Sequence, residues 1–186
     1  MIGYALCGSF CTVERSLKVL RSLCAEGNSV QPIMSDAVYG TDTRFGKAED
    51  IKNTVENLCG RKIIHTIVDA EPLGPKSPLD ILVICPCTGN TLAKIASGIT
   101  DTPVTMAAKA HLRCDRPLVI ALATNDALSA NLDNIGTLMK RKNVFFVPMA
   151  QDDPKGKPHS LVCDFDRVRE TMMSAFAGRQ IQPVME

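Results

Sequence analysis

The residues best suited to binding chemistry stand in short polar turns, each directly after an apolar run of the chain. The turns are Gly8-Ser9, Ser35-Asp36, Thr88-Gly89-Asn90-Thr91 and Thr124-Asn125. Their hydroxyl and amide groups can donate hydrogen bonds to a phosphate or to the polar edges of a ring. If the apolar runs are parallel strands, these turns share one edge of a sheet, where α/β proteins bind ligands. The pattern therefore favours a small-molecule site that includes a phosphate.

The longest of these turns has a second interpretation. Leu92, Ile95 and Ala96 follow it at helical spacing, and Gly98 is placed to end that helix. The polar side chains of residues 88–91 could therefore simply cap the N-terminus of the helix. Binding and capping use the same residue types, so the spacing leaves both interpretations open.

The apolar runs before the turns are predicted to form a parallel sheet. Residues 81–85 are apolar without alternation, which is typical of a strand buried on both faces. Pro86 is expected to end this strand, because it has no N–H to donate. The other predicted strands are residues 2–7, 30–34, 62–68, 117–123 and 144–147.

Helical patterns alternate with these strands. They cover residues 13–24, 48–58, 92–96, 103–112, 128–139 and 165–176. The tail after Gly178 is expected to be loose. Alternating strands and helices, joined by right-handed crossovers, are typical of doubly wound proteins. The sequence therefore predicts a three-layer, Rossmann-like α/β fold with a doubly wound, mainly parallel sheet, in one domain spanning residues 1–186.

Four of the cysteines could approach one another if the first and fourth predicted strands are neighbours. They are Cys7, Cys11, Cys85 and Cys87. Zinc sites usually place two to four residues between paired cysteines, whereas only Pro86 separates Cys85 from Cys87. Free cysteines in a reducing compartment also pack as small apolar residues. We therefore expect packing and no metal site, with a reactive thiol as the alternative.

The histidines are scattered along the chain. His65 lies in a predicted strand and is expected to be a core residue with satisfied hydrogen bonds, and His111 is expected on a helix surface. His159 follows a polar loop, where a ligand-binding role is the less favoured alternative. No Ser–His–Asp triad or carboxylate pair can be identified from the spacing, so the catalytic residues stay unassigned.

Composition argues against several classes of function. With a formal net charge of +1, the chain lacks the basic surplus of nucleic-acid-binding proteins, so no nucleic-acid partner is expected. No apolar run approaches the ~20 residues that span a bilayer, and residues 1–9 lack the basic start of a signal peptide. The protein is therefore expected in the cytoplasm, with no membrane partner.

The segment after the fourth predicted strand carries a family resemblance. Residues 86–101, Pro-Cys-Thr-Gly-Asn-Thr-Leu-Ala-Lys-Ile-Ala-Ser-Gly-Ile-Thr-Asp, resemble the P-x-(S/T)-x-N-T-(L/M)-x-K-I-A-x-G-I-x-D signature of the flavoprotein family. That family includes homo-oligomeric flavin-containing cysteine decarboxylases and flavin prenyltransferases. The resemblance covers nearly the whole chain, and it implies FMN as cofactor and a homo-oligomeric assembly.

The family's flavin-binding positions fall in the polar turns of this chain. The matching residues are Gly8, Ser9, Phe10, Ser35, Thr88, Asn90, Thr91, Ala123, Thr124 and Asn125. The resemblance places the FMN phosphate at residues 8–10 and Ser35, and the flavin ring at residues 88–91. In the decarboxylases the last turn carries Pro-Ala-Met-Asn and helps to bind substrate. Here only Asn125 of that motif is retained, and no counterpart of the decarboxylases' catalytic histidine is found.

Within the family, the chain is most similar to members that serve as one half of a two-component oxidoreductase in spore-forming bacteria. Residues 123–128 and 148–154 contribute to this likeness. It implies oxidation of a dihydrodipicolinate-type small molecule to pyridine-2,6-dicarboxylate during sporulation, with the other component, the A subunit, carrying NAD(P) as one possibility. The alternatives are an FMN-dependent decarboxylase or prenyltransferase, and a non-catalytic subunit that stabilises its partner.

Overall fold

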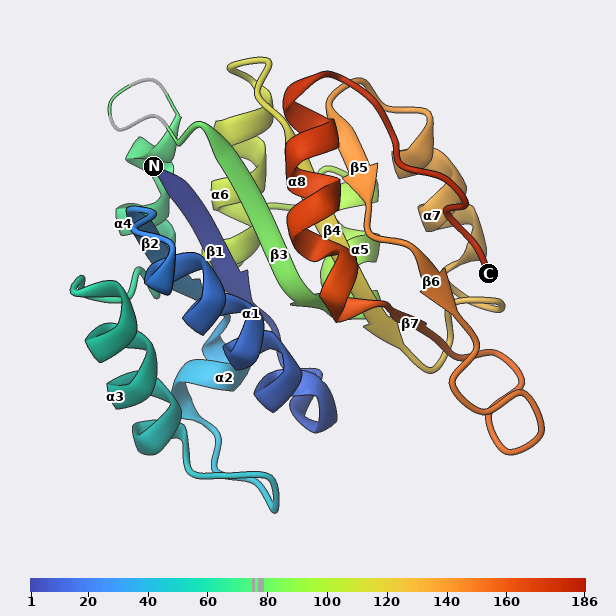
Figure 1. Ribbon diagram of the computed structural model, residues 1–186, viewed down its shortest axis with the longest axis horizontal. Coiled ribbons are helices and arrows are strands. Elements are labelled where there is room, and N and C mark those ends of the chain that lie inside the picture. Colours follow the sequence, from blue (N-terminus) through green and yellow to red (C-terminus); the bar gives the residue numbers. More distant parts are fainter. Residues whose placement is uncertain (75, 77–78) are drawn as a thin grey trace.

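A computed structural model describes residues 1–74, 76 and 79–186 (Figure 1). The strands within these residues are β1 (Ile2–Leu6), β2 (Val30–Met34), β3 (Ile81–Cys87), β4 (Leu118–Thr124), β5 (Val144–Phe146), β6 (Met149–Ala150) and β7 (Leu161–Cys163). They form one sheet in the order β2-β1-β3-β4-β7-β6, and β5 pairs with β4 outside that path. The pairs among β1 to β5 are parallel, whereas β7 runs antiparallel to both β4 and β6.

Helices connect most of the strands. The α-helices within the described residues are α1 (Val13–Ala25), α2 (Asp36–Gly40), α3 (Ala48–Cys59), α4 (Ile67–Ala70), α5 (Gly89–Ala96), α6 (Pro103–Leu112), α7 (Leu132–Met139) and α8 (Val168–Phe176). Short 3-10 turns are η1 (Phe10–Thr12), η2 (Glu71–Leu73) and η3 (Phe165–Arg167). No helix in the part of the chain that the structure describes is long and apolar enough to cross a membrane.

Alternate side chains of the central strands enter two separate cores. Tyr4, Leu6 and Val83 pack on the side covered by α1, α3 and α8. Ala5 and Ile84 pack on the opposite side, against α5, α6 and α7. Figure 1 shows α1 and α8 in front of the sheet, and α5, α6 and α7 behind it. These three layers around a mainly parallel sheet confirm the predicted fold class.

The prediction of a strand at residues 62–68 is wrong. Only Ile64 forms an isolated bridge, with Ile33 beside it, and the chain then enters α4 (Ile67–Ala70). Thr66 is the N-cap of this helix, since its side chain accepts a hydrogen bond from the backbone N–H of Asp69 at 3.1 Å. The β-branched run in this segment suggested a strand, but the cap starts a helix at its centre.

Pro86 does not end the strand that contains it. The strand β3 continues to Cys87, and its register with β4 shifts between Ile84 and Cys87. On the other side, the Pro86 carbonyl accepts a hydrogen bond from the Cys7 N–H at 3.1 Å. At an irregularity of this kind, the missing N–H of proline breaks no regular ladder bond. The strand therefore reaches further toward the polar turn than the sequence indicated.

The C-terminal tail is held in place, so the prediction that it is loose is wrong. The Gln180 side chain accepts from the Phe146 N–H and donates to the Phe146 carbonyl, both at 2.7 Å. Ile181 is buried, and Met185 forms a parallel bridge with Met149. The tail thus satisfies backbone groups beside β5, which a composition-based argument about termini cannot anticipate.

His111 is fully buried, contrary to the predicted surface position. Its Nε2 lies 2.8 Å from the Pro117 carbonyl, which can only accept, so Nε2 carries the proton. Nδ1 has no hydrogen-bond partner among the described residues. Burial lowers the pKa of His111 below 6.5, because the charged ring would lack water. His65, the histidine that was predicted to lie in the core, is only half-buried and stacks on Tyr39.

We expect the neutral His111 ring to make the protein less stable in mild acid. A histidine whose pKa is lower in the folded state than in the unfolded state favours folding fully above the unfolded pKa of about 6.5. This contribution to the free energy of unfolding is lost as the pH falls from that value through the folded pKa. One such proton lowers the free energy of unfolding by at most about 1.4 kcal/mol per pH unit. Urea unfolding of the wild type and His111→Gln from neutral to mildly acidic pH measures the difference. Parallel pH profiles for both proteins would contradict the assignment.

Candidate functional site

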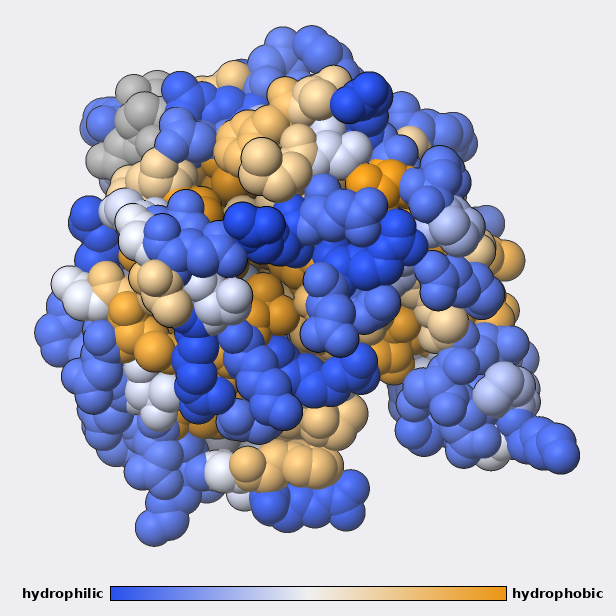
Figure 2. All heavy atoms as spheres, in the orientation of Figure 1, coloured by the Kyte–Doolittle hydropathy of each residue, from blue (hydrophilic) through white to orange (hydrophobic). Residues whose placement is uncertain are grey.

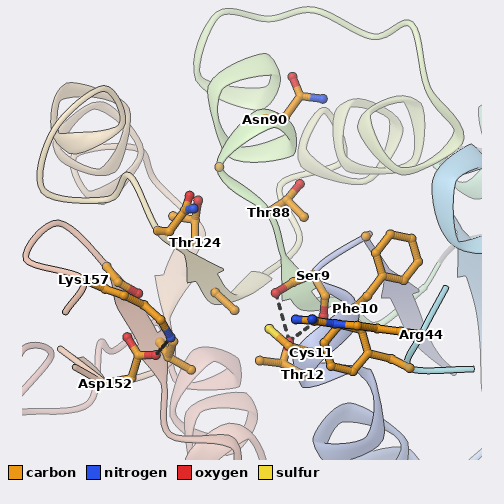
Figure 3. Close-up of a pocket in the computed structure, with 17 residues that line it drawn as sticks. Ser9, Phe10, Cys11, Thr12, Arg44, Thr88, Asn90, Thr124, Asp152 and Lys157 are labelled. Atoms are coloured by element: carbon orange, nitrogen blue, oxygen red, sulfur yellow. Dashed lines mark hydrogen bonds and ion pairs between the residues drawn. The ribbon is translucent and has the colours of Figure 1, made fainter.

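A cavity of about 700 Å³ opens where β1, β3 and β4 end (Figure 3). Its size lies within the range of small-molecule and cofactor sites. The residues that line it are Gly8, Ser9, Phe10, Cys11, Thr12, Arg44, Phe45, Thr88, Gly89, Asn90, Ala123, Thr124, Asn125, Asp152, Lys157, Ser160 and Val162. Three of the four predicted polar turns therefore meet at one edge of the sheet, as the sequence indicated.

The loop after β1 presents hydrogen-bond donors to this cavity. Ser9 is the N-cap residue of η1, but its side chain makes no capping hydrogen bond. The Thr12 hydroxyl donates to the Ser9 carbonyl at 2.9 Å and to Ser9 Oγ at 3.1 Å (Figure 3). Since Ser9 Oγ accepts here, its own proton stays available for a ligand. The first N–H groups of η1 have no acceptor within the helix and add further donors.

The turn after β3 both caps a helix and lines the cavity. Thr88 is the N-cap of α5: its Oγ1 accepts from the Thr91 N–H at 3.3 Å and donates to Thr91 Oγ1 at 3.1 Å. The buried Thr91 hydroxyl donates in turn to Cys7 Sγ at 3.4 Å. Thr91 is thus the residue whose N–H is capped, its hydroxyl bonds Thr88 and Cys7, and it does not line the cavity. Thr88 and the exposed Asn90 do line it.

The turn after β4 packs tightly against the start of α5. The Thr124 hydroxyl donates to Asp126 Oδ1 at 2.6 Å. A Cβ on Gly89 would lie 2.7 Å from Thr124 Oγ1, 2.7 Å from Asp126 Oδ1 and 2.6 Å from Asn131 Nδ2. Such distances are too short for carbon, so only glycine lets the two turns approach this closely. The close approach brings Thr88 and Thr124 to the same wall.

Ser35 lies beside the cavity without lining it. It is the N-cap of α2, and its Oγ is buried with no hydrogen-bond partner among the described residues. Ala37 in α2 lies close to the loop after β1: a Cβ on Gly8 would be 3.3 Å from Ala37 Cβ. A buried hydroxyl without a partner is uncommon in proteins. Ser35 Oγ is therefore a donor whose proton has no acceptor within the described part of the chain, and the Ser35 N–H donates to the Leu6 carbonyl at the end of β1 at 3.0 Å.

Two further loops contribute cavity residues that the sequence analysis missed. Arg44 and Phe45 come from the connection between α2 and α3, and Asp152, Lys157 and Ser160 come from the loop between β6 and β7. In Figure 2 this second loop protrudes as a hydrophilic lobe, separated from the main body by an indentation. In this loop the sequence analysis named only His159 as a candidate for ligand binding, and His159 does not line the cavity.

The charged residues of the second loop neutralise one another. The Lys157 ammonium lies 2.9 Å from Asp152 Oδ2 (Figure 3). Hydrogen bonds from Ser160 and Lys157 lower the pKa of the Asp152 carboxyl, and the hydrogen bond to Asp152 raises the pKa of Lys157. Both groups are therefore charged at neutral pH and form an ion pair at the cavity wall.

The cysteines near the cavity behave mainly as packed core residues. Cys7 directly follows β1, and Cys85 lies in β3, which pairs with β1. Burial raises the pKa of Cys7 and of Cys85 to about 11, so both thiols are protonated at neutral pH. Cys11 is exposed and lines the cavity. Within the described residues, no group of three or more His, Cys, Asp or Glu side chains is placed to hold a metal ion.

Comparison with known proteins assigns the chain to a family. The family model described as Flavoprotein matches residues 1–175. This chain belongs to the flavoprotein family. The matched region contains every strand of the sheet and every residue that lines the cavity.

Two relatives within the family resemble the chain over nearly its full length. It is 46% identical over 184 residues to the B subunit of dipicolinate synthase from Bacillus subtilis (strain 168), and the match covers 99% of this chain and 92% of that protein. The crystal structure of the B subunit of dipicolinate synthase from Bacillus halodurans C superimposes with a TM-score of 0.91 at 43% identity, covering 100% of this chain and 95% of the other.

More distant flavoproteins share the fold. The crystal structure of the FMN-dependent cysteine decarboxylase SpaF has a TM-score of 0.70 at 23% identity, and covers 95% of this chain and 96% of that one. At this level of identity the likeness concerns the arrangement of the strands and helices alone.

Proposed function

We propose that this chain acts as the B subunit of a dipicolinate synthase. Together with the A subunit, it would oxidise a dihydrodipicolinate-type precursor to pyridine-2,6-dicarboxylate during sporulation. The observation that supports this most strongly is the 46% identity to the Bacillus subtilis protein over 184 residues, with matching length. A single domain over residues 1–186 and a location in the cytoplasm of the mother cell belong to the same proposal.

We further propose that FMN binds in the cavity at the sheet edge. The fit rests on the available Ser9 hydroxyl and the first N–H groups of η1, which line the cavity and together suit a phosphate, whereas the buried Ser35 Oγ lies outside the cavity lining. Thr88, Asn90 and Asn125 line the rest of the cavity and can both donate and accept toward a polar ring edge. When bound, the flavin supplies the acceptor for two electrons.

In this proposal the chain's own residues bind, orient and shield the substrate. Phe10, Phe45 and Val162 give the cavity apolar walls that exclude water from the reacting faces. The protruding β6–β7 loop closes one side with the Asp152–Lys157 pair. Formation of an aromatic product ring favours the reaction. We place NAD(P) with the A subunit, so that electrons leave this chain through its partner.

The decarboxylase alternative is less well supported. The turn Ala123-Thr124-Asn125 stands where those enzymes carry Pro-Ala-Met-Asn, and no counterpart of their catalytic histidine is found. A homo-oligomer is part of our proposal. One fold relative, a UbiX-like decarboxylase from Escherichia coli O157:H7, is dodecameric, and Ile99 and Leu132 are exposed apolar side chains suited to such contacts.

The proposed function is tested by reconstitution with the A subunit. Purified chain, its partner, FMN and NAD(P) are mixed with freshly generated dihydrodipicolinate, and the product is measured by liquid chromatography and mass spectrometry. We expect pyridine-2,6-dicarboxylate only when both proteins are present. Equal rates when the partner acts without this chain would contradict a catalytic role, and carbon dioxide release by this chain alone would favour a decarboxylase.

Asn90→Leu is expected to weaken FMN binding by about tenfold, because one hydrogen-bonding side chain of the cavity is removed. The free energy of unfolding should change by less than about 0.5 kcal/mol, since Asn90 is an exposed residue. FMN fluorescence titration and urea unfolding measure the two effects. Asn53→Leu on the exposed face of α3 is the matched control. Equal FMN affinity in the Asn90 variant and this control would place the ring elsewhere.

A further inference from the structure

Three charged side chains line the cavity: Arg44, Asp152 and Lys157. Asp152 and Lys157 form an ion pair on the β6–β7 loop, with 2.9 Å between Oδ2 and Nζ. Arg44 lines the cavity from the connection between α2 and α3, and Figure 3 draws it on the opposite side of the view from Asp152 and Lys157. Among the described residues, no carboxylate lies within ion-pair distance of Arg44. The cavity therefore has one positive charge that the described part of the protein leaves uncompensated.

The backbone around Arg44 forms a tight turn that fixes where this charge stands. Thr43 and Gly46 exchange backbone hydrogen bonds at 3.0 and 3.1 Å, and the Thr43 hydroxyl accepts from the Phe45 N–H at 3.1 Å. Asp42 Oδ1 accepts from the Ala48 N–H at 2.8 Å and ties the turn to α3. A turn held in this way fixes the backbone from which the Arg44 side chain extends, so binding needs no further ordering of that backbone.

Arg44 also contacts the aromatic ring of Phe45. A guanidinium within about 6 Å of the centre of an aromatic ring makes a cation–π contact, and here the guanidinium carbon lies 4.8 Å from the Phe45 ring centre. Such stacking occupies the face of the guanidinium and leaves its N–H edge for hydrogen bonds. That edge matches the two oxygens of a carboxylate.

We propose that Arg44 binds one carboxylate of a pyridine-type dicarboxylate substrate in this cavity. The inference rests on the proposed function, because that function supplies the dicarboxylate. The flavin phosphate is the competing oxyanion, but the Ser9 hydroxyl and the η1 N–H groups already offer it donors. Lys157 contributes less to substrate binding than Arg44, since Asp152 already neutralises it. Arg44 is therefore a specificity-determining residue for a substrate with an acidic group.

The test compares ligand binding by FMN-loaded wild type, Arg44→Gln, Arg44→Lys and, as a charge control outside the cavity lining, Lys155→Gln. Calorimetry measures the affinity for pyridine-2,6-dicarboxylate and for pyridine-2-carboxylate, and fluorescence quenching of each apoprotein measures the affinity for FMN. We expect Arg44→Gln to bind the dicarboxylate about 10–100-fold more weakly, as for loss of a charged hydrogen bond. Arg44→Lys should fall between, because one ammonium cannot match both carboxylate oxygens. Lys155→Gln should lose less than about threefold, since Lys155 is an exposed lysine of the β6–β7 loop that does not line the cavity.

The outcomes separate this inference from the proposed function. FMN affinity within about threefold of wild type in Arg44→Gln, together with a smaller preference for the dicarboxylate over the monocarboxylate, supports the inference. Equal dicarboxylate affinity in wild type and Arg44→Gln overturns it and leaves the proposed function intact. A parallel loss of FMN affinity also overturns it and assigns Arg44 to the phosphate. A wild type that binds neither pyridine carboxylate overturns the proposed function together with the inference.

Discussion

Ser9→Asp is expected to abolish FMN binding while the protein stays folded. The new carboxylate would face the phosphate in the loop after β1, and two like charges brought together cost several kcal/mol. This corresponds to a loss of affinity of about a thousandfold or more. The fold should tolerate the change, because Ser9 is the N-cap residue of η1 and aspartate is well accepted at N-caps. Fluorescence titration with FMN measures the affinity, and thermal unfolding checks the fold.

Ser9→Ala separates the effect of charge from the loss of a hydroxyl. Without the Ser9 donor, we expect FMN affinity to fall only about tenfold, in line with one lost hydrogen bond. Thr12 keeps its hydrogen bond to the Ser9 carbonyl in both variants. If the aspartate variant binds FMN as well as the alanine variant does, the phosphate does not lie at this loop.

Gly89→Ala is expected to disrupt both the cavity and the stability of the protein. The added Cβ would stand within 2.7 Å of Thr124 Oγ1, Asp126 Oδ1 and Asn131 Nδ2. These atoms belong to hydrogen-bonded side chains, so they cannot all move without losing contacts. Overpacking of this kind costs about 1–3 kcal/mol. We expect a corresponding loss in the free energy of unfolding and at least about a tenfold loss of FMN affinity, since α5 moves away from β4.

Gly136→Ala in α7 is the matched control for this substitution. A Cβ on Gly136 meets no atom within 4 Å, and alanine is the better helix former by about 1 kcal/mol. The control should therefore be as stable as the wild type or more stable, with unchanged FMN affinity. Urea unfolding of both variants provides the comparison. A Gly89 variant that behaves like the Gly136 variant would show that the tight contact between the turns is unimportant.

The strand positions at the centre of the sheet followed from the sequence because their burial leaves a simple pattern. Residues 81–85 are apolar without a break. A strand that is covered on both faces needs apolar side chains at successive positions. The predictions for residues 62–68 and for the C-terminal tail were wrong because the hydrogen bonds of a single side chain in each segment outweigh the general tendency of the residue types. Thr66 caps a short helix inside a β-branched run, and Gln180 ties down a tail that composition marks as loose. The hairpin of β6 and β7 escaped prediction because its strands are very short.

The candidate site was partly foreseeable for a similar reason. Polar turns after parallel strands must meet at one edge, which brings Ser9, Thr88 and Thr124 together. Arg44 and Lys157 could not be found in this way, because they lie on connections whose course depends on tertiary packing. A family signature does not by itself show which of its side chains face the cavity. Thr91 belongs to the signature, yet its hydroxyl donates to Cys7 Sγ inside the protein.

The most direct test of whether the cavity at the sheet edge binds flavin is titration of FMN with the purified wild-type chain. Flavin fluorescence is followed at increasing protein concentration, first with the chain alone and then in the presence of its proposed partner. We expect saturable quenching at one FMN per chain, and competition by free phosphate at high concentration because the phosphate anchors the ligand. Absence of quenching under both conditions would contradict this expectation.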